Sequence, residues 1–179
     1  MNSVTKKATK KDLSVISWTK DEYNSLDPKA LAEVLEPRVS EGQALDVLVS
    51  LVENGTIEIK DPEALMDWTY KAVQVAGIDA EVVKQIPGKV EPKTKLTMAE
   101  FETTSAADIA NYFRLYTTAG RAARIILALI EQGYKPATEK VVQLTNSRIC
   151  IEGVSLPKQN KQRSSVLLKG VTVNNGTTA

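Results

Sequence analysis

The sequence contains no histidine and only one cysteine, Cys150, among its 179 residues. Without an imidazole, a Ser-His-Asp triad, a Cys-His dyad, histidine acid–base catalysis and an imidazole zinc site are all excluded. A single thiol excludes an internal disulfide and a cluster of thiolate metal ligands. The chain also lacks a glycine-rich phosphate loop and a carboxylate pair within a catalytic motif. The sequence therefore predicts a protein that is not an enzyme and that holds no metal and no cofactor.

Long apolar runs are missing as well. No stretch of 18 consecutive apolar residues occurs, and no apolar segment follows the N-terminal lysines. This pattern predicts neither a membrane span nor a secretory signal peptide. We therefore expect that the protein has no membrane partner and is located in a reducing cytosol. With 42% hydrophobic and 25% charged residues, the composition is typical of a folded globular chain.

The formal net charge of +1 hides an uneven distribution. Residues 1–20 carry five basic residues and one acidic residue, a net charge of +4, and residues 135–179 carry seven and two, a net charge of +5. Residues 21–134 carry 11 basic and 19 acidic residues, a net charge of −8. Basic chain ends bind polyanions by releasing counterions, and they also attract an acidic neighbouring subunit. A solvated tail that only aids solubility is the alternative for the N-terminal block.

Signals for the start and end of helices are dense from Asp27 onward. Asp27 and Asp61 each precede a proline and a helical repeat of apolar residues, and Ser40 precedes another such repeat. The repeat after Asp61 extends to Gly77, which predicts one helix ending there. Because residues 55–60 make a short connection, we expect the helices on either side of it to form an antiparallel pair.

The most apolar part of the chain follows residue 104. A helix that begins after Thr104 or Ser105 is expected to break at Gly120 and to continue over Arg121–Gln132, and these two segments predict the central buried helix pair. Other segments are predicted by their composition: a short helix at 80–85, a surface loop at 86–95, a last helix at 138–144, and strands at 148–152 and 165–173.

We therefore predict a mainly α fold with three parts. A basic N-terminal arm covers residues 1–24, a helical bundle core covers 25–145, and an extended or β-hairpin C-terminal arm covers 146–179. Cys150, between two isoleucines, is expected to be a small buried side chain on a strand.

Cationic and aromatic residues of the apolar helix pair are the candidate binding residues. Arg114 and Arg121 are seven residues apart and would share a face if the helix ran through Gly120. Such arginines either pair with acids such as Asp108 or line a groove for phosphates, and the interleaved tyrosines either fill the core or stack on bases. The candidates for a nucleic-acid groove are Tyr112, Arg114, Tyr116, Arg121, Arg124, Lys135, Lys140 and Arg148. The candidates for assembly arms are Lys6, Lys7, Lys10, Lys11, Lys158, Lys161 and Arg163.

The segment Asn111–Tyr116, followed by Gln132–Val141, resembles the core region of coat proteins of flexible filamentous plant viruses, in which an arginine-aromatic helix precedes a G-[YF]-x-P-like turn and a basic residue. Leu51–Thr56 is similar to a helix end in that group. The resemblance implies a helical core, an N-terminal arm on the neighbouring subunit, a C-terminal extension along the filament interior, and genomic RNA in a basic groove. We therefore expect a viral coat or nucleocapsid protein, found in the virion and the host cytoplasm, that polymerises with itself and packages single-stranded RNA.

Two alternatives remain open. Ser105–Phe113 resembles the first helix of a helix-turn-helix, with Arg121–Leu129 as the recognition helix and Arg148–Val173 as a wing, which would make the protein a regulator that binds duplex DNA. The other alternative is a protein-interaction scaffold that has no nucleic-acid partner.

Overall fold

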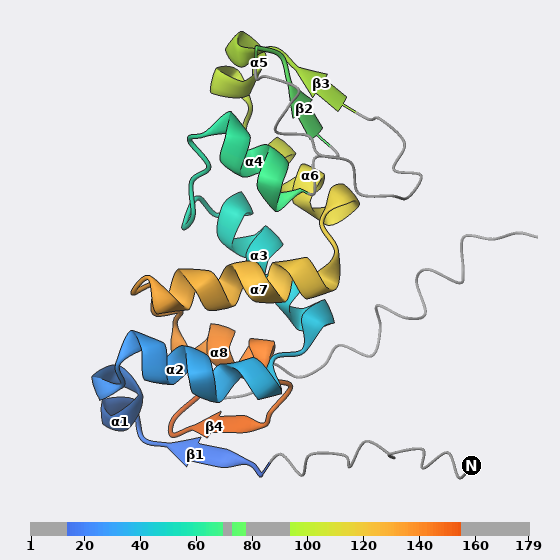
Figure 1. Ribbon diagram of the computed structural model, residues 1–179. Helices are drawn as coiled ribbons and strands as arrows, with labels where there is room; N and C mark the ends of the chain where they lie inside the picture. The colour runs from blue at the N-terminus through green and yellow to red at the C-terminus, as the bar shows by residue number, and fades with distance from the viewer. Residues whose placement is uncertain (1–13, 70–72, 78–93, 155–179) are drawn as a thin grey trace, which may run out of the picture.

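The computed structural model describes residues 14–69, 73–77 and 94–154 (Figure 1). The fold is mainly α, as predicted. The helices are α1 (Lys20–Ser25), α2 (Pro28–Leu35), the 3₁₀ helix η1 (Glu36–Arg38), α3 (Glu41–Glu53), α4 (Pro62–Trp68), α5 (Met98–Thr103), α6 (Ala106–Tyr116), α7 (Ala119–Glu131) and α8 (Thr138–Leu144). The strands are β1 (Ile16–Trp18), β2 (Val73–Val75), β3 (Thr94–Leu96) and β4 (Ile149–Ile151).

The predicted central buried pair is confirmed for one of its two helices. Helix α6 packs on α3 and leaves residues such as Arg114 and Leu115 exposed, whereas α7 forms the centre of the molecule. It packs on α3 and α2, and α3 also packs on α6 and α8. Ile126 and Ile130 of α7 and Leu48 of α3 are almost completely buried in this core. In Figure 1, α5, β2 and β3 lie at one end of the molecule, and β1 and β4 lie at the other.

Several helices begin where the sequence places their caps. The carboxylate of Asp27 accepts hydrogen bonds from the backbone N–H groups of Lys29 and Ala30, and that of Asp61 accepts one from Glu63. Helix α3 begins directly after Ser40, although the serine side chain makes no capping hydrogen bond. The predicted helix at 138–144 and the strand predicted at 148–152 are both present.

The helix predicted to run from Asp61 to Gly77 is wrong in its second half. Helix α4 ends at Trp68, and Val73–Val75 forms strand β2, which pairs in parallel with β3. Val73 and Val75 are buried on either side of the half-buried Gln74, and this alternation of β-branched residues fits a strand better than a helix. The main neighbours of α4 are β2 and α7, so it does not form the expected antiparallel pair with α3. The predicted helix at 80–85 and residues 86–93 of the predicted loop lie outside the described residues. The last two residues of that loop, Thr94 and Lys95, belong instead to β3, because they pair with Val73 and Gln74 of β2.

The break within the apolar helix pair lies earlier than Gly120. Thr117 and Thr118 are both extended, and the Thr118 hydroxyl caps α7 by accepting a hydrogen bond from the Arg121 backbone at 3.3 Å. Gly120 is helical, and a Cβ there would lie 3.1 Å from the carboxylate of Glu41. Because the helix is interrupted between Arg114 and Arg121, their spacing does not place them on one continuous face.

Residues expected in the two arms belong to the folded body. Strand β1 pairs in parallel with β4, with Ile16 opposite Ile149, and Tyr23 of α1 is only 2% exposed. The body therefore begins before residue 25 and continues past residue 145. Cys150 is exposed, contrary to expectation, because the buried side of β4 is occupied by its two isoleucines. The remaining parts of the arms, including the predicted strand at 165–173, lie outside the described residues.

Candidate nucleic-acid interface

Arg121 is held within the body by an acidic partner. Its Nη2 lies 2.9 Å from Oδ1 of Asp67 and also donates a hydrogen bond to the Asp67 backbone carbonyl. The Arg121 side chain is only 20% exposed. Of the two roles that the sequence leaves open for this arginine, the structure shows the internal ion pair.

Arg124 lies one turn further along α7 and is exposed. Together with Arg121 and Trp68 it lines a groove of about 380 Å³. On its other side, Arg124 lines a second groove that contains Glu33, Glu36 and Glu131. Carboxylates so close to the guanidinium oppose a bound phosphate, so the electrostatics of this face are mixed.

Lys135 and Lys140 connect elements of the body. The Lys135 ammonium donates hydrogen bonds to the carbonyl oxygens of Asn24 and Leu26, at 2.6 and 3.1 Å, and lies 5.2 Å from the centre of the Tyr23 ring. These carbonyls are at the C-terminal end of α1, where a cation is favourable. Lys140 donates to the Ser50 hydroxyl at 3.0 Å and so joins α8 to α3.

Three of the candidates lie on α6. Tyr112 and Tyr116 are half-buried and pack against the hydrophobic core, and burial is the main reason that the pKa of Tyr112 lies above its ordinary value. Arg114 is exposed and donates a hydrogen bond to Oδ1 of Asn111 at 3.2 Å. The neighbouring Leu115 is 71% exposed. This face of α6 thus offers one cation and one apolar side chain, with the tyrosines used mainly for packing.

The remaining described candidate, Arg148, lies directly before β4. Its side chain is exposed, and its carbonyl accepts a hydrogen bond from the Ile16 backbone at 3.0 Å. The groove candidates are therefore divided among α6, α7, α8, the turn before α8 and the start of β4, and they do not form a single groove.

The two strands next to Arg148 are the described elements nearest in sequence to the two basic ends of the chain. In a parallel pair both strands run in the same direction, so the start of β1 and the end of β4 lie at opposite ends of the pair (Figure 1). Three residues per strand at about 3.3 Å each separate these points by about 10 Å along the sheet. The assembly candidates Lys6, Lys7, Lys10, Lys11, Lys158, Lys161 and Arg163 are in the two basic ends of the chain and lie outside the described residues.

Two neighbours of the candidate residues were not found from the sequence. Asp67, the partner of Arg121, is 54 residues away in the chain, and no helical spacing connects the two. Lys20 lies against the turn after β4, where its ammonium would be 3.8 Å from a Cβ at Gly153. The only sequence signal that included Lys20 was the positive charge of residues 1–20, and this charge does not indicate a contact with the turn after β4.

The described residues contain no group of three or more acidic or cysteine side chains that could hold a metal ion. None of the helices in the described part of the chain has the length and hydrophobicity needed to cross a membrane. Comparison of the chain with family models, with curated proteins and with solved structures finds no match.

Proposed function

We propose that this protein is a viral structural protein, of the coat or nucleocapsid type, that assembles with itself and packages single-stranded RNA. In this proposal the RNA is bound mainly by the two basic chain ends. The groove arginines play a smaller part, because Arg121 is paired with Asp67 and Arg124 lies close to carboxylates.

The parallel pairing of β1 with β4 is the observation that carries the proposal. Residues 1–13 have a net charge of +3 and residues 155–179 a net charge of +4, whereas residues 14–154 have a net charge of −6. The pairing attaches both basic segments to the same small sheet. Two cationic segments attached to one small sheet raise the positive charge around it and favour a polyanion without base-specific contacts.

The acidic body supports the assembly part of the proposal. A body with a net charge of −6 attracts the basic ends of a neighbouring copy, and such a contact between different surfaces repeats from subunit to subunit. RNA and a neighbouring body therefore compete for the same basic segments or share them.

The geometry favours this proposal over a helix-turn-helix regulator. A recognition helix presents its exposed face to the DNA, but the exposed face of α7 carries Glu131 as well as Arg124. Glu33 and Glu36 line the groove beside this face, so its charge opposes a phosphate backbone. Competition between labelled oligouridine and duplex DNA of mixed sequence distinguishes the two functions. We expect oligouridine to win, and tight selection of one duplex would favour the regulator.

Salt-dependent binding of labelled oligouridine tests where the RNA is held. We expect Lys10→Gln/Lys11→Gln and Lys158→Gln/Lys161→Gln each to weaken binding and to flatten the plot of log affinity against log salt by about 0.7 for each phosphate that is no longer neutralised. The matched control is Lys29→Gln/Lys95→Gln, which removes two exposed lysines from elsewhere on the body. Equal weakening by the control would show that only total charge matters and would contradict binding at the chain ends.

A further inference from the structure

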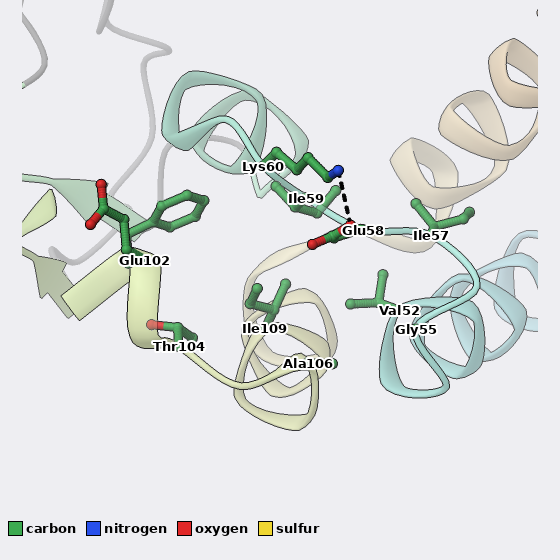
Figure 2. Close-up of a pocket in the computed structure, with 11 residues that line it drawn as sticks. Val52, Gly55, Ile57, Glu58, Ile59, Lys60, Glu102, Thr104, Ala106 and Ile109 are labelled. Carbon is green, nitrogen blue, oxygen red and sulfur yellow. Dashed lines mark ion pairs between the residues drawn. The ribbon is translucent and has the colours of Figure 1, made fainter. Parts of the chain in front are cut away.

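A cleft lies between the connection that follows α3 and the helices α5 and α6 (Figure 2). Its volume is about 430 Å³. Apolar side chains line it, and four of them, Val52, Ile59, Phe101 and Ile109, are more than nine-tenths buried. The cleft is thus an apolar trough that opens to solvent.

Charged side chains surround the opening of this cleft. Glu58 lies on the connection and Glu102 on α5, and both are exposed (Figure 2). Lys60, the cation among the lining residues, has its ammonium 3.3 Å from the Glu58 carboxylate. Because Lys60 and Glu58 offset each other, the rim has a net negative charge through Glu102.

We propose that the cleft binds residues 165–173 of a second copy of this chain. That segment contains five aliphatic residues, and residues 155–179 as a whole carry four basic residues and no acidic one. The aliphatic residues of the segment would be buried against the apolar lining of the cleft, and its positive charge is opposite to the negative charge of the rim. The inference gives a specific contact to the self-assembly within the proposed function and rests on that part of it.

The position of the cleft in the fold favours a second copy over the same chain. Residues 155–179 follow β4, whereas α5 lies at the opposite end of the molecule in Figure 1. Residues 155–164 provide a tether that spans up to about 35 Å when extended. A segment that leaves one end of a subunit and binds the other end of the next makes a head-to-tail contact, which repeats as a ring or an open filament.

Cysteine trapping between two variants of the full chain tests this contact directly. Both variants carry Cys150→Ser; one adds Thr104→Cys in the cleft and the other adds Val171→Cys in the segment. After nuclease treatment and mild oxidation of the mixture, we expect a disulfide-linked heterodimer in at least tenfold greater yield than when Lys29→Cys on α2 replaces Thr104→Cys. Ala106→Arg, which fills the cleft from an exposed lining position, should abolish the trapping. Ala107→Arg, at an exposed position that does not line the cleft, should leave it unchanged.

The outcomes separate this contact from RNA binding. A heterodimer yield no greater than that of the Lys29→Cys control would overturn the proposal. A third variant carries Thr104→Cys and Val171→Cys in one chain, and a disulfide that forms only within that chain would also overturn it. Helical circular dichroism of each variant verifies that it is folded. Oligouridine binding is measured on the same variants, and we expect Ala106→Arg to change it less than twofold. If the disulfide does not form but oligouridine binds normally, only the cleft contact is contradicted. If the disulfide forms but oligouridine does not bind, only the RNA proposal is contradicted.

Discussion

Tyr23 shows how one side chain joins three parts of the fold. Its hydroxyl donates a hydrogen bond to the Pro136 carbonyl, the Lys135 ammonium lies over its ring, and the ring of Trp18 is 6.2 Å away. Burial is the main reason that the pKa of Tyr23 lies well above its ordinary value, and Tyr134 adds to the shift. The phenol is therefore kept neutral in the folded protein.

The raised pKa of Tyr23 predicts loss of stability in alkali. Below the unfolded pKa near 10 the stabilisation by the neutral phenol is fully present, and it is lost as the pH rises through the higher folded pKa. We expect Tyr23→Phe to lower the free energy of unfolding at pH 7 by about 1 kcal/mol and to flatten its decline above pH 10. Urea unfolding between pH 7 and 11 measures both effects. An unchanged alkaline slope would contradict the role given to Tyr23.

The contact between Arg121 and Asp67 predicts an effect on folding instead of on RNA. We expect Arg121→Ala to lower the free energy of unfolding by about 1 kcal/mol, because the hydrogen bonds to Asp67 are removed. Asp67→Ala should have a smaller effect, because it keeps the backbone carbonyl to which Arg121 donates, and the double variant should cost less than the sum of the two. Oligouridine affinity should change less than twofold. A large loss of oligouridine affinity with an unchanged free energy of unfolding would indicate that Arg121 binds RNA.

At the scale of helices and strands, short local signals identified most of the long helices and missed two short ones. Helices α1 and α5 each begin with a capping box, Thr19–Glu22 and Thr97–Glu100. The S/T-x-x-E pattern is visible in the sequence, but neither helix has a strong apolar repeat behind it. In each box, hydrogen bonds from the threonine hold the pKa of the glutamate below its ordinary value.

The position of the break between α6 and α7 predicts the effect of a cap substitution. The hydroxyl of Thr118 satisfies a backbone N–H at the start of α7. We expect Thr118→Ala to lower the free energy of unfolding by about 1 kcal/mol, whereas Thr118→Ser should retain most of the stability because it keeps the hydroxyl. Thermal or urea unfolding followed by circular dichroism makes the comparison. Equal losses in the two variants would place the effect in the methyl group and not in the cap.

At the scale of the whole molecule, charge and topology act together. The sheet of β1 and β4 joins residues that are more than 130 positions apart in the sequence, so strands near the two ends of the chain lie side by side. The apolar cleft lies toward the other end, beside α5 and α6. A subunit with different surfaces at its two ends suits a head-to-tail polymer.

This polarity predicts the result of removing the first basic segment. Deletion of residues 1–11 removes four lysines and leaves β1 and the rest of the body in place. We expect assembly to weaken while the helical circular dichroism is retained, because only the charge at one end is removed. Deletion of the uncharged residues 174–179 is the control. Sedimentation velocity and negative-stain microscopy record the particle size, and an unchanged size distribution after the first deletion would remove the N-terminal segment from the assembly mechanism.

The helical class and the starts of several helices followed from local sequence, because a cap residue and an apolar repeat act within a few turns. The candidate site was less predictable. For Lys135 and Arg121, the sequence cannot distinguish a cation that binds phosphate from one that forms hydrogen bonds within the fold. Their partners, Asn24 and Asp67, are more than 50 residues away in the chain. Cys150 faces outward although isoleucines flank it, since neighbouring residues in a strand point to opposite faces.

Composition and spacing thus established a mainly helical chain without histidine chemistry and with basic ends around an acidic middle. The pairing of β1 with β4, the burial of arm residues such as Tyr23 and the cleft between α3 and α5 depended on contacts between distant segments. Such contacts form because apolar surface and backbone hydrogen bonds must be satisfied over the whole molecule at once, and no local pattern records which distant segment will satisfy them.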